Sequence, residues 1–345
     1  MRLTRRSVTG LIAGAAIAAG FGVGAKAQEV TLSLHGFLPP QANIPKLIID
    51  PWIRQIEKAS GGRIKIVHYP SMQLGGRPPE LYDQVVDGIA DITYTVVGYT
   101  PGRFPSTEVF ELPFFVPDSR AASAALWQLI DERLQDTEFA DTQILGAWMH
   151  GPGVIHANQP VRLPSDLNGM KVRGPSRMIN KLLETLGATP VGMPVPAVPE
   201  ALSKGVIDAT VIPWEVTGAL KVPELVHNHT EFDGDYFYTV SFVLAMNKEK
   251  WESLPDDLKK VIMDNSGIKF SVFAADQQTN ADVPAREAAI KRGNNIITVK
   301  GDDLKVWHDA AQPVYESWLQ EMKAKGIDGQ ALIDYARRKM AAYKG

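Results

Sequence analysis

Gly88-Ile-Ala-Asp-Ile-Thr93 and Gly205-Val-Ile-Asp-Ala-Thr210 repeat one pattern at two distant places in the chain. In each stretch a glycine suits the left-handed residue that ends a helix, and an aspartate begins the next strand. The stretches are either two ordinary helix-to-strand turns or the marks of two similar α/β lobes. Because ligands bind beyond the carboxyl ends of parallel strands, the second interpretation predicts that Thr95–Tyr99 and Ile212–Glu215 face each other across a cleft.

Strand and helix patterns alternate on both sides of these stretches. Strands are predicted at 30–34, 64–69, 91–97, 144–149, 153–157, 170–173, 208–212, 236–246 and 296–299. Helices are predicted at 47–59, from 79 to about 89, at 120–134, 176–186, 199–204, 255–292 with interruptions at Gly267 and Pro284, and from 302 to the C-terminus. This alternation is typical of parallel α/β sheets. The chain has 345 residues, and at about 150 residues per domain we expect two domains.

The composition excludes several classes of protein. With 45% apolar and 22% charged residues the chain is globular rather than fibrous or disordered. It contains no cysteine, which excludes disulfides, thiolate metal sites and cysteine nucleophiles. Lysine and arginine never occur in a run longer than three, so the sequence offers no footprint for nucleic acid.

The first 27 residues have the pattern of a secretory signal peptide. Arg2, Arg5 and Arg6 precede an apolar run, and Ala25-Lys-Ala27 forms a small-residue cleavage site. The paired arginines allow export by the twin-arginine route or by the general secretory route. The alternative is an uncleaved membrane anchor, although the run is short and rich in glycine and alanine. Cleavage would leave 32 basic and 39 acidic residues, a net charge of −7.

A search for catalytic motifs finds none of the common ones. The sequence lacks a glycine-rich phosphate loop, an H-E-x-x-H helix and a G-x-S-x-G elbow. His227-Asn-His229 is the one close histidine pair. On a strand the two rings would share a face and could bind a metal, and the alternative is a solvated turn. An enzyme is therefore unsupported, and we predict no metal and no cofactor.

Met170-Lys-Val-Arg-Gly-Pro-Ser176 places an arginine where a strand ends and a helix begins. The planar guanidinium of Arg173 matches the two oxygens of a carboxylate, and the free N–H groups of a helix start also favour an anion. Arg177, one turn further on, could add to such a site. The alternative for Arg173 is a structural salt bridge.

Several segments occur together in the order and spacing of one protein family. They are Pro70–Gly76, Pro101–Pro105 with Glu111–Phe114, Leu167–Arg173 and Gly205–Asp208. In these segments the chain resembles the DctP-type solute-binding proteins of tripartite ATP-independent periplasmic (TRAP) transporters, and the resemblance spans the whole mature chain.

The resemblance implies the two-lobed α/β fold of a type II-like periplasmic binding protein, with a long helix crossing both lobes. It implies a lobe I formed by 28–150 and 238–280 and a lobe II formed by 151–237 and 281–345. It also implies a periplasmic protein that captures a small organic carboxylate and delivers it to a sodium-coupled TRAP permease. In the family, the arginine at the position of Arg173 holds the carboxylate.

Two departures from the family bear on the ligand. Gly153 stands where sugar-acid binders carry a second arginine, and Ile212 stands where an asparagine is common. Both replacements are smaller or more apolar, so the resemblance predicts an aromatic, keto or hydroxy acid rather than a sugar acid. With Arg173 and Arg177, the expected ligand contacts are Phe37, Tyr99, Trp214, His35, His150 and Glu215, with Trp214 as the main flat surface. The rival functions are a receptor module for a signalling partner and a secreted enzyme on the same scaffold.

Overall fold

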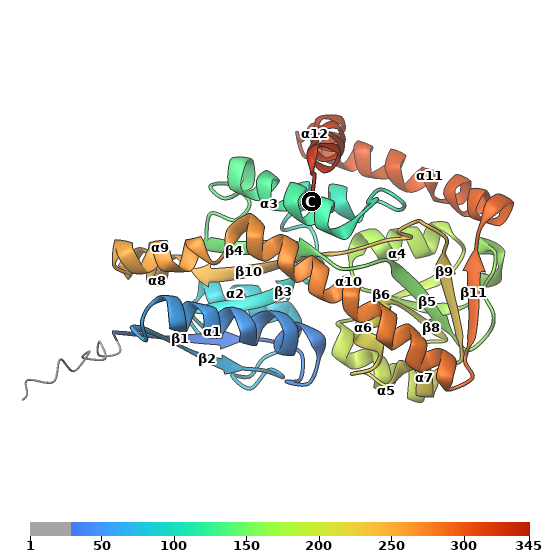
Figure 1. Ribbon diagram of the computed structural model, residues 1–345. Helices are drawn as coiled ribbons and strands as arrows, with labels where there is room; N and C mark the ends of the chain where they lie inside the picture. The colour runs from blue at the N-terminus through green and yellow to red at the C-terminus, as the bar shows by residue number, and fades with distance from the viewer. Residues whose placement is uncertain (1–28) are drawn as a thin grey trace, which may run out of the picture.

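Two β-sheets flanked by helices divide the chain into two lobes (Figure 1). The structure is a computed structural model and describes residues 29–345. The predicted signal peptide, residues 1–27, lies outside the described residues. The α/β class and the two-lobed architecture that the sequence predicts are confirmed.

Lobe I contains five strands: β1 (Val30–His35), β2 (Ile64–Tyr69), β3 (Ile92–Val96), β4 (Thr142–Met149) and β10 (Ser241–Asn247). They form one sheet in the order β2-β1-β3-β10-β4. The α-helices of this part are α1 (Asp50–Ala59), α2 (Leu81–Val86), α3 (Ser119–Leu129), α8 (Lys248–Ser253) and α9 (Asp256–Asp264). Shorter helical turns are η1 (Ile44–Ile49), η2 (Pro78–Glu80), η3 (Val97–Tyr99), η4 (Pro105–Glu111) and η5 (Ile130–Leu134).

Lobe II contains six strands: β5 (Gly153–Ala157), β6 (Lys171–Gly174), β7 (Thr189–Gly192), β8 (Ala209–Pro213), β9 (Asn228–Phe232) and β11 (Asn295–Val299). Their order is β11-β9-β5-β8-β6-β7. The helices are η6 (Pro164–Leu167), α4 (Arg177–Thr185), η7 (Val195–Ala197), α5 (Val198–Ser203), α6 (Trp214–Thr217) and α7 (Val222–Leu225). The sequence patterns missed β7 and β9, which are short and carry proline or histidine.

The repeated stretches have the same role in both lobes. Gly88 and Gly205 have positive φ angles of 71° and 65°, as the helix-stop prediction requires. The side chains of Asp91 and Asp208 each accept a hydrogen bond from a backbone N–H of a neighbouring strand, β1 and β6, at 2.7 and 2.8 Å. Each aspartate therefore fixes the start of a strand that leads toward the other lobe.

The expectation of purely parallel sheets is wrong, because β10 and β5 run antiparallel to their neighbours. The cause is the chain crossing. The chain passes from β4 to β5 through residues 150–152 and returns from β9 to β10 through 233–240. A strand that follows a crossing enters its sheet from the cleft, where the parallel strands end, so it must run the opposite way.

A 25-residue helix, α10 (Gly267–Lys291), crosses both lobes as expected (Figure 1). It packs on α3 and β4 of lobe I and on α6 of lobe II. Gly267 begins this helix with a positive φ of 66°, but the predicted interruption at Pro284 is wrong because the helix continues through it. Packing against both lobes offsets the loss of the one backbone hydrogen bond that Pro284 removes.

The C-terminal segment forms two helices rather than the one predicted. α11 (Gly301–Ala324) packs on α4, and α12 (Gly329–Ala342) packs on α3 and η4. Most of the buried apolar side chains form one continuous cluster that runs through both sheets. Within residues 29–345, no helix is both long enough and apolar enough to cross a membrane.

Candidate ligand-binding site

A pocket lies between the two lobes. Strand ends and turns of both lobes supply its lining residues: Phe37, Leu38, Ile44, Val96, Tyr99, His150, Arg173, Pro175, Val195, Ile212, Pro213, Glu215, Val216, Tyr238, Val240 and Phe242. Residues of the segments Thr95–Tyr99 and Ile212–Glu215 thus line one pocket, as the interpretation of two lobes facing a cleft predicts.

Arg173 is the cation of the pocket. It lies on β6 and is 1% exposed. Its Nε donates to the backbone oxygen of Met193 at 2.8 Å, and its Nη1 donates to that of Val211 at 3.2 Å. Its Nη2 is buried and has no hydrogen-bond partner. Burial lowers the pKa of Arg173 from its ordinary value, yet a guanidinium remains charged in proteins.

The guanidinium is therefore only partly satisfied. Two of its five N–H groups are used by backbone oxygens, and no carboxylate among residues 29–345 pairs with it. A salt bridge, the structural alternative for Arg173, is absent from the described part of the chain. A buried cation without a counter-ion is costly, so the pocket holds an unpaired positive charge.

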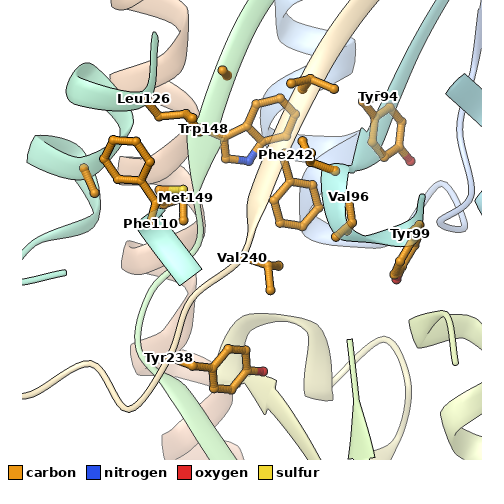
Figure 2. Close-up of a cluster of buried hydrophobic side chains, with 14 of the residues drawn as sticks. Tyr94, Val96, Tyr99, Phe110, Leu126, Trp148, Met149, Tyr238, Val240 and Phe242 are labelled. Atoms are coloured by element: carbon orange, nitrogen blue, oxygen red, sulfur yellow. The ribbon is translucent and has the colours of Figure 1, made fainter. Parts of the chain in front are cut away.

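Two tyrosines lie beside the guanidinium. Tyr99 and Tyr238 both interact electrostatically with Arg173. The hydroxyl oxygen of Tyr99 accepts a hydrogen bond from the backbone N–H of Val195 at 2.9 Å, which leaves the O–H free to donate. In Figure 2 the hydroxyls of both tyrosines lie on the side of the space between the lobes. Burial raises the pKa of both groups, so both remain protonated donors at neutral pH.

The rest of the pocket wall is apolar. Val240 and Phe242 follow Tyr238 along the crossing segment and point into the same space (Figure 2). Phe37 packs edge-on against Tyr99, with ring centroids 5.7 Å apart. These rings and branched side chains offer no hydrogen-bond partner to a hydroxyl-rich ligand, whereas a flat apolar ligand body would be buried favourably.

His150 lines the pocket, but both of its ring nitrogens are engaged. Nδ1 is 2.5 Å from the backbone oxygen of Gly151, and Nε2 is 3.2 Å from the backbone nitrogen of Val240, which donates to it. This arrangement requires the neutral Nδ1–H tautomer. Burial lowers the pKa of His150 to about 4. The imidazole is thus a neutral part of the wall rather than a second cation.

Glu215 lies at the edge of the pocket and is 4% exposed. Its carboxylate accepts from the side-chain amides of Gln278, at 2.9 Å, and Asn43, at 3.1 Å. Its backbone N–H donates to Asp282 at 2.7 Å. Burial raises the pKa of both acids, and the charge of Glu215 raises that of Asp282 further. Two amide donors stabilise the ionised form of Glu215. Asp282 therefore holds a proton more readily than Glu215 does.

Five of the eight predicted contact residues line the pocket, and three do not. Trp214, expected as the main flat surface, is outside it. Its ring packs instead against His156 and His229, with centroids 5.0 and 4.9 Å away, and against Ala289 of α10. As the first residue of α6 it turns toward the long helix, whereas its neighbours on either side line the pocket.

The other two residues outside the pocket have structural roles. The Nδ1 of His35 is 2.7 Å from the Gln84 side-chain oxygen, and its Nε2 accepts from the backbone N–H of Leu74 at 3.2 Å. This histidine therefore holds the turn after β2. Arg177 forms ion pairs with Glu108 and Glu321, so it links α4 to η4 and α11 rather than facing the pocket.

Sequence reasoning missed the residues of the second crossing. Tyr238, Val240 and Phe242 come from a run that reads simply as a long strand. The available signal was the length of this run, since the strand itself begins only at Ser241 and the residues before it cross the cleft.

The two histidines at 227–229 have different environments, because His227 is exposed before the strand and His229 is buried on it. His229 lies on β9 and is fully buried, with its Nδ1 2.7 Å from Nδ1 of His156. Burial lowers the pKa of His229 to about 4 and also lowers the pKa of His156, so these two touching rings are neutral at physiological pH. Within residues 29–345 no group of three histidine or acidic side chains is arranged to hold a metal ion.

Comparisons with known proteins agree with this geometry. The model of bacterial extracellular solute-binding protein family 7, DctP, matches residues 39–322. A TRAP solute-binding protein from Rhodoferax ferrireducens, solved with co-purified benzoate, is 44% identical. The match covers 90% of this chain and 98% of that one, with a TM-score of 0.88.

Two further solved structures are similar over nearly their whole length. A marine metagenome TRAP protein from an unidentified microbe, specific for aromatic acids and solved with 3-hydroxybenzoate, is 43% identical. The match covers 92% of this chain and 100% of that one, with a TM-score of 0.90. A Bordetella bronchiseptica protein with bound mandelate is 27% identical, over 90% and 99% of the chains, with a TM-score of 0.84. The chain thus belongs to the DctP family of extracellular solute-binding proteins, the receptors of TRAP transporters.

Proposed function

We propose that the protein binds a small aromatic monocarboxylate in the pocket between its lobes, with Arg173 as the carboxylate anchor. The observation that carries this proposal is the buried guanidinium whose Nη2 has no partner. A bound carboxylate supplies the missing counter-charge. Its oxygens also accept hydrogen bonds from the free N–H groups of Nη1 and Nη2. We propose no chemical reaction at the site.

The preference for an aromatic ligand rests on the apolar lining. Phe37, Tyr99, Tyr238 and Phe242 surround the pocket with rings, and the branched side chains of Ile212 and Val216 fill the gaps. A ring buried here gains contact with other rings, worth about 0.5–1.5 kcal/mol. Each sugar hydroxyl buried without a partner would cost about 1–3 kcal/mol. The aromatic acids bound by the three similar structures support the same ligand class.

The cellular role follows from the family. We propose that the chain is exported to the periplasm by its N-terminal signal, residues 1–27, and passes its ligand to a sodium-coupled TRAP permease. The rival role, a receptor for a signalling partner, would use the same pocket. Ligand uptake by vesicles that contain the permease, with and without this protein, separates the two roles. Uptake that does not depend on the protein contradicts the transport role.

Calorimetry with a panel of acids tests the ligand class. Benzoate, 3-hydroxybenzoate, mandelate, pyruvate, succinate and glucuronate are titrated in one buffer, and we expect the aromatic acids to bind most tightly. Arg173→Ala should abolish benzoate binding. Arg162→Ala is the control, because Arg162 lies outside the pocket on an exposed ion pair. Tightest binding of glucuronate, or unchanged benzoate affinity in Arg173→Ala, would contradict the proposal.

A further inference from the structure

The crossing segments place Gly153 directly beneath the ring of Tyr238. The backbone N–H of Gly153 donates to the backbone oxygen of Tyr238 at 2.9 Å. A Cβ atom at position 153 would lie 2.0 and 2.2 Å from two ring carbons of Tyr238. No side chain fits there unless the ring moves, so the absence of a side chain at 153 sets where the ring of Tyr238 lies.

Tyr238 is held on its other side by His150. The two rings meet edge to face, with centroids 5.5 Å apart and an interplanar angle of 81°. His150 is itself fixed through both ring nitrogens. The ring of Tyr238, which is 1% exposed, is therefore packed between Gly153 and His150, and it borders the pocket beside Arg173.

The hydroxyl of Tyr238 has no other use within the described chain. Its ring makes the packing contacts, but the hydroxyl forms no hydrogen bond with any residue in 29–345. Because Tyr238 lines the pocket, its hydroxyl is available to donate to a bound group. The unpartnered Nη2 of Arg173 lies in the same pocket. Arg173 Nη2 and the Tyr238 hydroxyl are thus both available to the two oxygens of one carboxylate, and the O–H of Tyr99 lies in the same pocket.

We infer that Tyr238 is a second carboxylate-binding residue, which donates its O–H to the ligand held by Arg173, and that Gly153 positions it. The inference rests on the proposed function for the anchor and extends it. A carboxylate accepts both donors at once, whereas an uncharged aromatic ligand such as benzamide presents only one acceptor oxygen. Tyr238 therefore contributes to the discrimination between carboxylates and neutral ring compounds.

The test is a double-mutant cycle on benzoate affinity with Tyr238→Phe and Gly153→Ala. Tyr238→Phe keeps the ring and removes only the donor, so it should fold normally and weaken benzoate about tenfold or more. Gly153→Ala displaces the ring and should weaken binding at least as much. Both variants act through one hydroxyl. The fold-loss of benzoate affinity in the double variant should therefore be smaller than the product of the two single-variant fold-losses.

Matched controls lie elsewhere in the fold. Gly146→Ala also places a Cβ against a buried ring, 2.3 Å from a ring carbon of Phe270, but away from the pocket. Tyr82→Phe removes a buried hydroxyl that bonds to Thr142 at 2.8 Å. Both controls should lower the melting temperature of the ligand-free protein and leave benzoate affinity within about twofold.

The outcomes separate this inference from the proposed function. Benzoate affinity within about twofold of wild type in Tyr238→Phe overturns the role of Tyr238. Losses that multiply in the double variant overturn the positioning role of Gly153. If a non-aromatic acid binds the wild type instead, the proposed ligand class fails. The cycle is then measured with that acid, since the hydroxyl acts on the carboxylate and not on the ring.

Discussion

The side-chain amide of Asn43 donates to both the backbone oxygen and the carboxylate of Glu215, at 2.7 and 3.1 Å, although the residues are 172 positions apart. Asn43 precedes η1 in lobe I, and Glu215 lies on α6 in lobe II. Ile44, next to Asn43, and Glu215 both line the pocket. These hydrogen bonds therefore join the lobes at the edge of the pocket and stabilise the arrangement that encloses it.

Asn43→Ala should weaken ligand binding by loosening this closed arrangement. The expected loss is about 0.5–1.5 kcal/mol, the usual net value of a hydrogen bond, and it should arise mainly from faster dissociation. Stopped-flow fluorescence with benzoate measures the dissociation rate. Unchanged kinetics would show that the contact does not contribute to retention of the ligand.

Ligand binding should close the two lobes about the crossing segments. Small-angle scattering should give a smaller radius of gyration with benzoate than without it, and Asn43→Ala should reduce the difference. The same scattering curve with and without a bound ligand would contradict the hinge prediction.

Arg173→Lys should keep the positive charge but lose the two-pronged donor. Lysine offers a point charge on a flexible stem and cannot replace the planar edge that Nη1 and Nη2 present. We expect benzoate affinity to fall by about 1.5–3 kcal/mol, the range for hydrogen bonds to charged groups. Calorimetry gives the value directly. Wild-type affinity in this variant would mean that charge alone anchors the ligand.

Glu111 should make the protein less stable as the pH rises. Burial raises its pKa to about 7, although the carboxyl accepts from Ser176 at 2.6 Å and from the backbone N–H of Ser241 at 3.3 Å. Below the ordinary pKa of a glutamate, Glu111 is protonated in both the folded and the unfolded state, so its ionisation costs no stability. Between the ordinary glutamate pKa and about 7 the unfolded state is ionised while the folded state stays protonated, so stability falls across this range. Above about 7 both states are ionised and the stability levels off.

Glu111→Gln removes this titration. Urea unfolding should show similar stability for variant and wild type near pH 4.5, but at pH 8 the variant should be more stable by roughly 1–3 kcal/mol. A difference between the two proteins that is the same at both pH values would contradict the assignment.

Trp214→Phe should change stability without changing ligand selectivity. The indole fills space between His156, His229 and α10, and its Nε1 donates weakly to Glu231 at 3.4 Å. We expect a loss of roughly 1–3 kcal/mol in unfolding free energy, typical of a buried large-to-small change. The ranking of the acid panel should stay as in the wild type. A reordered ranking would place the indole in the pocket after all.

The sequence determined the α/β class, the two lobes and the position of Arg173 at a strand end because these depend on local patterns. Strand and helix periods lie within short windows, and the stretch around Arg173 places its strand end and helix start side by side. The two glycine-aspartate turns likewise fix adjacent elements. The expected preference for an apolar carboxylate rests on Ile212 standing where the resembled family commonly has an asparagine.

Only the tertiary structure decided which rings line the pocket. Trp214 and Glu215 are adjacent in sequence, yet one packs under α10 and the other borders the pocket, because a single step along the backbone turns a side chain to another face. Tyr238 reaches the pocket from a crossing segment 85 positions beyond Gly153, whose missing side chain makes room for it. Side-chain direction and space left by a distant residue are products of packing, and no local pattern in the sequence encodes them.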